Sequence, residues 1–213
     1  MHLDQGQIDV VFDLYDRDIR KDQTDDYRDI SNATSLLMRL ELEGVDVGDR
    51  WQELADLSAA RTEDGCLIFA DLHYLLALSA ENRNSDIAQM LGRMHRDAEN
   101  TTQDMSVRMN KPGLDAAIGL EAFGDARYAD AFAHLADARD TMQLAGGSHA
   151  QRDVFERMTI DAGLRAGLLG QAEAILNERQ ALRGGTEDAY TAARRDLIAA
   201  GRGQSAVQSV PAQ

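Results

Sequence analysis

Residues 146–158, GGSHAQRDVFERM, decide the fold, because they contain the junction between two successive helices. The two glycines end one helix, Ser148 is placed to cap the next, and Gln151 stands three residues later, where a capping box has Glu or Gln. Apolar residues then recur every four positions on one face: Ala150, Val154, Met158 and Ala162. The stretch therefore predicts a joint between two amphipathic helices.

The composition of the 213 residues favours helices throughout. Only two prolines are present and aromatic residues make up 5%, whereas Ala, Leu, Met, Arg, Gln and Glu abound. These are strong helix formers, and runs of the β-branched residues that strands prefer are few. We therefore predict an all-α protein.

Helical periodicity continues on both sides of the joint. We expect helices over residues 4–20, 27–43, 51–60, 67–80, 85–94, 114–123, 128–144, 148–166, 169–182 and 186–200. Ser85 and Thr186 are predicted to cap the helices that they begin, and Pro112 to stand in the first turn of its helix. Residues 67–80 are apolar on nearly every side, so we expect this helix to be the innermost one.

Residues 115–138 follow the tetratricopeptide pattern, in which a small residue lets two helices approach closely. Gly119 takes the small position of the first helix. The aromatic, small, large and small positions of the second helix are taken by Tyr128, Ala131, Leu135 and Ala138. Residues 148–182 repeat the pattern, with Gly167 at the turn. The repeats diverge, because glycine turns recur about every 40 residues instead of about 34, and Gln143 replaces the terminal proline.

The repeats predict a right-handed α-α superhelix of divergent tetratricopeptide-like hairpins over residues 1–201 and a flexible tail at 202–213. Residues 4–20 read as the second helix of a hairpin whose first helix is missing. Half a repeat cannot bury its apolar face alone. We therefore expect either that the chain is the C-terminal part of a longer protein or that residues 1–20 are covered by another chain.

Several segments, spread over almost the whole chain, carry a family resemblance. They are GGSHAQRDVFERM (146–158), LNERQAL (176–182), LEGVDVGDRWQELA (42–55), FADLHYLLAL (69–78) and LYDRDI (14–19). In these segments the chain resembles the tetratricopeptide repeat protein 38 family. The resemblance implies an all-helical superhelix within a longer protein. It implies no particular activity, because the family name describes architecture.

Charge and cysteine content exclude several classes of partner and site. A net charge of −15 argues against nucleic acid and anionic membranes as partners. The start of the chain has no signal-peptide pattern and no apolar run approaches the roughly 18 residues of a membrane span, so we expect a cytoplasmic protein. The lone Cys66 precludes an intrachain disulfide and a multi-cysteine zinc site. Its apolar neighbours favour a buried structural thiol.

His149 and Arg152 are the candidate binding residues. They stand three apart at a helix start, where an anion or carboxylate can meet both side chains and free backbone N–H groups. The alternative is that His149 caps or packs locally and that Arg152 pairs with Asp153 or Glu156.

His73 is the third candidate. It lies four residues after Phe69 and three before Leu76, which favours a hydrogen-bonded core histidine. It cannot share a metal ion with Asp71, because residues two apart on a helix point to opposite sides. Neither H-x-x-x-H nor H-E-x-x-H spacing occurs, so no metal or other cofactor is predicted.

The sequence contains neither a glycine-rich phosphate loop nor a nucleophile elbow. We therefore expect a non-enzymatic protein–protein interaction module that binds a protein or peptide segment, or a second copy of itself through residues 4–20. The alternative is an enzyme or small-ligand-binding protein whose pocket brings together His73, His149 and Arg152.

Overall fold

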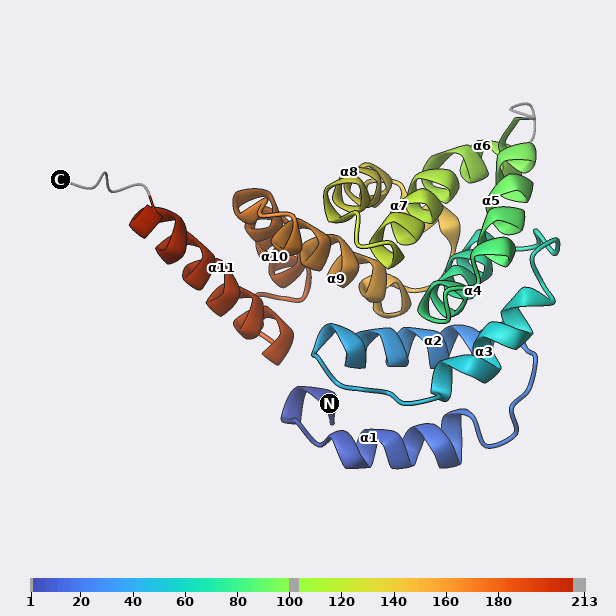
Figure 1. Cartoon of the computed structure of the whole chain (residues 1–213), viewed down its shortest axis with the longest axis horizontal. Helices are drawn as coiled ribbons and strands as arrows, with labels where there is room; N and C mark the ends of the chain where they lie inside the picture. The colour runs from blue at the N-terminus through green and yellow to red at the C-terminus, as the bar shows by residue number, and fades with distance from the viewer. Residues whose placement is uncertain (1, 100–103, 209–213) are drawn as a thin grey trace.

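Every regular element is helical in the computed structural model, which describes residues 2–99 and 104–208, the last five by their backbone only (Figure 1). The predicted all-α class is therefore confirmed for the described residues. In chain order the elements, with η marking short 3-10 or π helices, are η1 (Leu3–Gln5), α1 (Ile8–Leu14), η2 (Tyr15–Ile19), α2 (Tyr27–Leu42), α3 (Arg50–Ala59), α4 (Ile68–Ala80), α5 (Asn84–Glu99), α6 (Asp104–Arg108), η3 (Met109–Leu114), α7 (Asp115–Gly124), α8 (Tyr128–Arg139), η4 (Met142–Ala145), α9 (His149–Arg165), α10 (Leu169–Leu182) and α11 (Ala189–Gln208).

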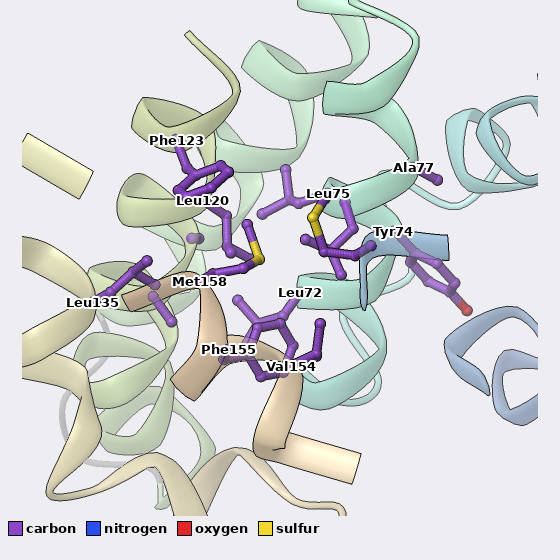
Figure 2. Close-up of a cluster of buried hydrophobic side chains, with 14 of the residues drawn as sticks. Leu72, Tyr74, Leu75, Ala77, Leu120, Phe123, Leu135, Val154, Phe155 and Met158 are labelled. Carbon is purple, nitrogen blue, oxygen red and sulfur yellow. The ribbon is translucent and has the colours of Figure 1, made fainter. Parts of the chain in front are cut away.

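Helix α4 is the innermost of the described helices, as its all-round apolar sequence predicted. Every residue from Ile68 to Leu78 is buried. Figure 2 shows Leu72 and Leu75 of this helix close to Phe155 and Met158, which belong to α9. Burial on all sides follows from the packing of α2, α3, α5 and α7 against α4.

Successive helices pair along the second half of the chain. Helix α7 packs on α8, α8 on α9, α9 on α10 and α10 on α11 (Figure 1). The pair α7 and α8 approaches closely at Gly119, where an added Cβ would lie 2.7 Å from Leu135 Cγ. A side chain at this position would push the two helices apart, so the glycine sets their separation.

The first and second halves of the chain also meet. Helix α2 packs on α9 as well as on α4, and Arg39 Nη2 donates to Ala150 O at 2.8 Å across 111 residues of sequence. Arg194 of α11 pairs with Glu43 at 2.9 Å, just beyond the end of α2. This contact between distant helices is additional to the stacking of neighbours that a repeat pattern implies.

The segment expected to need an outside partner, residues 4–20, is partly covered by its own chain. Val11 and Tyr15 are 5% and 3% exposed, and the Arg50 guanidinium from α3 lies 5.9 Å from the Tyr15 ring centroid. Arg20 pairs with Glu53 of α3. Val11 and Tyr15 are therefore covered within the chain itself, whereas coverage of the segment by a second chain stays a prediction.

Two predicted caps are wrong. Helix α5 begins at Asn84, so Ser85 is already its second residue. At α11 the capping residue is Asp188, whose Oδ1 accepts from Thr191 N at 2.9 Å, and Thr186 lies outside the helix. Asp188 is favoured because Arg179 holds its carboxylate in place at 2.8 Å.

Part of the predicted tail is helical, because α11 continues to Gln208 instead of ending at Ala200. The remainder of the predicted tail, residues 209–213, lies outside the described residues. The extension rests on tertiary contacts: an added Cβ on Gly201 would lie 2.9 Å from Leu169 Cδ1, and Arg202 pairs with Glu173 at 2.6 Å. Helix α8, in contrast, ends early at Arg139, and η4 follows it.

Candidate binding groove

A groove of about 640 Å³ runs between α8, α9 and α10. Leu135, Met142 and Phe155 contribute apolar lining. Charged residues from all three helices line it as well, and Leu182 at the end of α10 is 79% exposed. We call this site the α8–α10 groove.

The start of α9, which forms one end of the groove, is built as the sequence predicted. Ser148 Oγ accepts from Gln151 N at 3.3 Å, and Ser148 N donates to Gln151 Oε1 at 2.8 Å, which completes the capping box. Gly147 has a positive φ of 71°, and an added Cβ would lie 2.5 Å from Phe69 Cε2. Only glycine therefore lets this loop pack against α4.

His149 and Arg152 both line the α8–α10 groove. Arg152 Nη1 donates to Gly146 O at 3.0 Å and also to Gly147 O, so the predicted pairing of Arg152 with Asp153 or Glu156 is wrong. The side chain bridges the loop before its own helix instead. His149 is exposed, and its ring has no hydrogen-bond partner among the described residues. The ring therefore makes no capping hydrogen bond.

His73 does not line the groove. Its side chain is fully buried, and its ring centroid lies 4.3 Å from that of Phe69 and 5.0 Å from that of Phe155. Nδ1–H donates to Phe69 O at 2.7 Å, because a carbonyl can only accept. Burial, with a smaller effect from the charge of Arg39, lowers the pKa of His73 to about 4. The predicted core histidine is confirmed, and a pocket joining His73 to His149 and Arg152 is not formed.

Asp71 and Cys66 lie near His73 in the sequence but do not belong to the groove. Asp71 pairs with Arg93 at 2.7 Å and shares no ligand with His73. Cys66 is exposed, so the prediction of a buried thiol is wrong. Helix α4 begins only at Ile68, which leaves Cys66 in the preceding loop instead of on the buried face.

One side of the groove is held by a charged cluster that links three helices. Arg139 of α8 donates to both carboxylate oxygens of Glu156, at 3.0 and 2.7 Å, and to Glu178 of α10 at 2.9 Å. A bidentate arginine–carboxylate pair fixes orientation as well as distance. One guanidinium therefore links α8, α9 and α10 at the groove.

A buried cluster that the sequence did not reveal supports the groove from behind. The guanidinium groups of Arg157, Arg179 and Arg194 lie 4.5, 4.9 and 4.1 Å from the ring centroid of Tyr190 on α11. The Tyr190 hydroxyl donates to Asp161 Oδ2 at 2.9 Å. Three cations on one ring require nearby carboxylates to be stable when buried.

Those carboxylates are supplied by α9 and by the cap of α11. Asp153 and Asp188 pair with Arg179 at 2.7 and 2.8 Å. Burial alone would raise the pKa of Asp153, but the hydrogen bond from Arg179 and the charge of Arg157 outweigh it, so this pKa lies below its usual range. Asp161, which pairs with Arg194 at 3.1 Å, has a raised pKa because burial dominates there.

A sequence signal for this cluster does exist. Arg179 stands seven residues after Ala172, as Ala138 stands seven after Ala131 in the preceding hairpin. A large cation thus occupies a position that the tetratricopeptide pattern fills with a small residue. Such a cation can be buried only beside carboxylates, which directs attention to Asp153 and Asp188.

Within the described parts of the chain, no group of three or more His, Cys, Asp or Glu side chains is arranged to hold a metal ion. No described helix is both long and apolar enough to cross a membrane. No protein-family model matches the chain, and no solved structure matches it either.

Proposed function

We propose that this chain is a non-enzymatic interaction module that binds an extended protein segment in the α8–α10 groove. The observation that carries the proposal is the lining of that groove, which combines an apolar floor with charges of both signs. A peptide offers the same combination, with apolar side chains for the floor and charged ones for the rim. Leu182, 79% exposed at the groove, offers an apolar side chain that a bound peptide would remove from water.

The proposal includes a tetratricopeptide-like arrangement of the hairpins in a right-handed superhelix. Its support is the close approach of helices at small residues. Besides Gly119, Gly163 of α9 has this role, since an added Cβ would lie 2.9 Å from Phe132 Cδ2 and 3.1 Å from Ala172 Cβ. Membership of the tetratricopeptide repeat protein 38 family and a cytoplasmic location belong to the same proposal and rest on the sequence alone.

A selection from a random peptide library, with the full-length protein as bait, tests the binding function. We expect enriched peptides whose affinity falls about tenfold in Leu182→Glu, because a charge replaces the exposed apolar contact. Leu197→Glu is the matched control: Leu197 is 56% exposed on α11 and does not line the groove. Peptides that bind both variants equally well, or the absence of any enriched peptide, would refute the proposal.

The small-molecule alternative retains only His149 and Arg152, since His73 is fully buried and does not line the groove. Binding measurements on two variants distinguish the peptide-binding hypothesis from the small-molecule hypothesis. A peptide-binding groove loses affinity in Leu182→Glu whether or not His149 is present, whereas a small-molecule site centred on the histidine responds to His149→Ala and tolerates the change at Leu182.

A further inference from the structure

A second hollow, of about 350 Å³, lies where the ends of α2, α4, α7 and α9 meet. Polar groups make up most of its exposed lining, and Met38, Leu42, Leu76, Leu120, Phe123 and Met158 contribute an apolar wall on one part of it. Figure 2 shows the side chains of Leu120, Phe123 and Met158 lying close together. A volume near 300 Å³ is at the lower end of the range for small-molecule sites.

Arg165 is the exposed cation of this lining. Its guanidinium lies 5.1 Å from the ring centroids of both Phe123 and Tyr128, and Nη1 donates to Tyr128 OH at 3.1 Å. It has no carboxylate within 4.0 Å among the described residues, whereas nearly all other arginines of this acidic chain are paired. The aromatic rings hold the cation and leave its charge available to an anion.

Ser79 provides an independent polar group in the same hollow. Its Oγ is buried and has no hydrogen-bond partner in the described residues. A buried hydroxyl without a partner is unfavourable, because the folded state does not replace the hydrogen bonds that it made with water. A ligand oxygen in the hollow would satisfy it.

Glu41, also in the lining, gives the hollow an acidic side. Its Oε1 accepts from Trp51 Nε1 at 2.8 Å, and burial raises its pKa. An anionic group is repelled from Glu41 and attracted to Arg165, so an elongated anion has one favoured orientation.

We propose that this Arg165 pocket binds a small amphipathic carboxylate, such as a medium-chain fatty acid. The carboxylate lies on the Arg165 guanidinium, and the alkyl chain lies against the apolar wall formed by residues such as Met38 and Met158. The site is separate from the α8–α10 groove and does not depend on peptide binding there.

Titration of the full-length protein with decanoate, below its critical micelle concentration, tests the site. With methyl-¹³C-methionine labelling, the Met38 and Met158 signals are expected to shift. The Met142 signal, from the α8–α10 groove, is expected to stay in place. 1-Decanol should bind about fivefold more weakly, because it lacks the charge that pairs with Arg165. Shifts of Met142 alone, or equal affinity for the acid and the alcohol, would overturn the proposal.

Substitutions separate the charge from the apolar wall. Arg165→Gln should lower decanoate affinity about fivefold and leave 1-decanol affinity unchanged. Arg202→Gln is the control, since it removes the same charge from α11, where Arg202 pairs with Glu173. Ala80→Leu, which adds volume to the lining from a half-buried position, should weaken both ligands. If Arg165→Gln binds decanoate as the unsubstituted protein does, the proposed orientation is wrong.

Discussion

Protonation of the buried His73 side chain makes the stability of this protein depend on pH. Its pKa falls from 6.5 to about 4 on burial. As pH decreases, His73 therefore binds its proton in the unfolded chain before it does so in the folded protein. The contribution of neutral His73 to stability is complete above pH 6.5 and is lost as pH falls towards 4.

We expect the free energy of unfolding to depend less on pH in His73→Asn than in the unsubstituted protein over that interval. One group contributes a slope of up to about 1.4 kcal/mol per pH unit. Urea unfolding at a series of pH values measures it. His149→Asn makes the same replacement at an exposed position and is the control. Identical slopes in the two variants would contradict this assignment.

Arg179 is the residue on which the buried charges depend most. It is 3% exposed and pairs with both Asp153 and Asp188. Arg179→Met removes the nearest cation of these two half-buried carboxylates and leaves Arg157, at 2.8 and 3.8 Å from them, as the cation that they share. We expect a loss of about 3 kcal/mol in unfolding free energy. Arg202→Met, which breaks an exposed pair with Glu173, should cost at most about 1 kcal/mol. If thermal or urea unfolding gave similar losses for Arg179→Met and Arg202→Met, the burial of Arg179 would not explain its contribution to stability.

At the scale of helices, glycine has opposite roles at two helical positions. Gly119→Ala places a Cβ 2.7 Å from Leu135 Cγ, and we expect a loss of about 1–3 kcal/mol as α7 and α8 are forced apart. Gly170→Ala on α10 meets nothing within 4 Å and should gain about 0.5–1 kcal/mol, because alanine favours the helix. Chemical unfolding of the two variants measures both effects. If Gly119→Ala were stabilising, the close approach of α7 and α8 at Gly119 would be disproved.

Local signals were sufficient for most helices. The bounds of α10 agree with the periodicity at both ends, and the capping box at Ser148 is present as predicted. Such features depend on residues three or four apart, which the sequence displays directly. The cap at Asp188 and the extension of α11 past Ala200 depend instead on Arg179 and Leu169, which are neighbours only in the folded chain.

For the whole molecule, the covered N-terminal segment changes the expectation about self-association. Val10 and Leu14 are the large apolar side chains of α1 that are 41% and 37% exposed. Two such residues fall short of the roughly 800 Å² per partner of a stable interface. We therefore expect light scattering to give 23.4 kDa at all concentrations. A mass that rises with concentration, and that Val10→Lys returns to the monomer value, would restore the dimer through residues 4–20.

The candidate site was predictable only in part. His149 and Arg152 were found because they lie on one turn at a helix start, and both do line the α8–α10 groove. His73 was grouped with them on residue type alone, and it is fully buried, with its ring centroid 5.0 Å from that of Phe155. Arg139, Glu156 and Glu178 were missed, because they come from three helices whose approach no local pattern specifies.

By itself, the sequence determined that this protein is helical, where most helices begin and end, and that α4 lies innermost, because each depends on short-range spacing and composition. Only the tertiary structure decided that α2 packs on α9 and that three arginines surround Tyr190. It also decided that Cys66 is exposed. These features arise from contacts between residues far apart in the chain, such as Arg39 and Ala150, and the free energy of such contacts depends on burial that only the folded molecule creates.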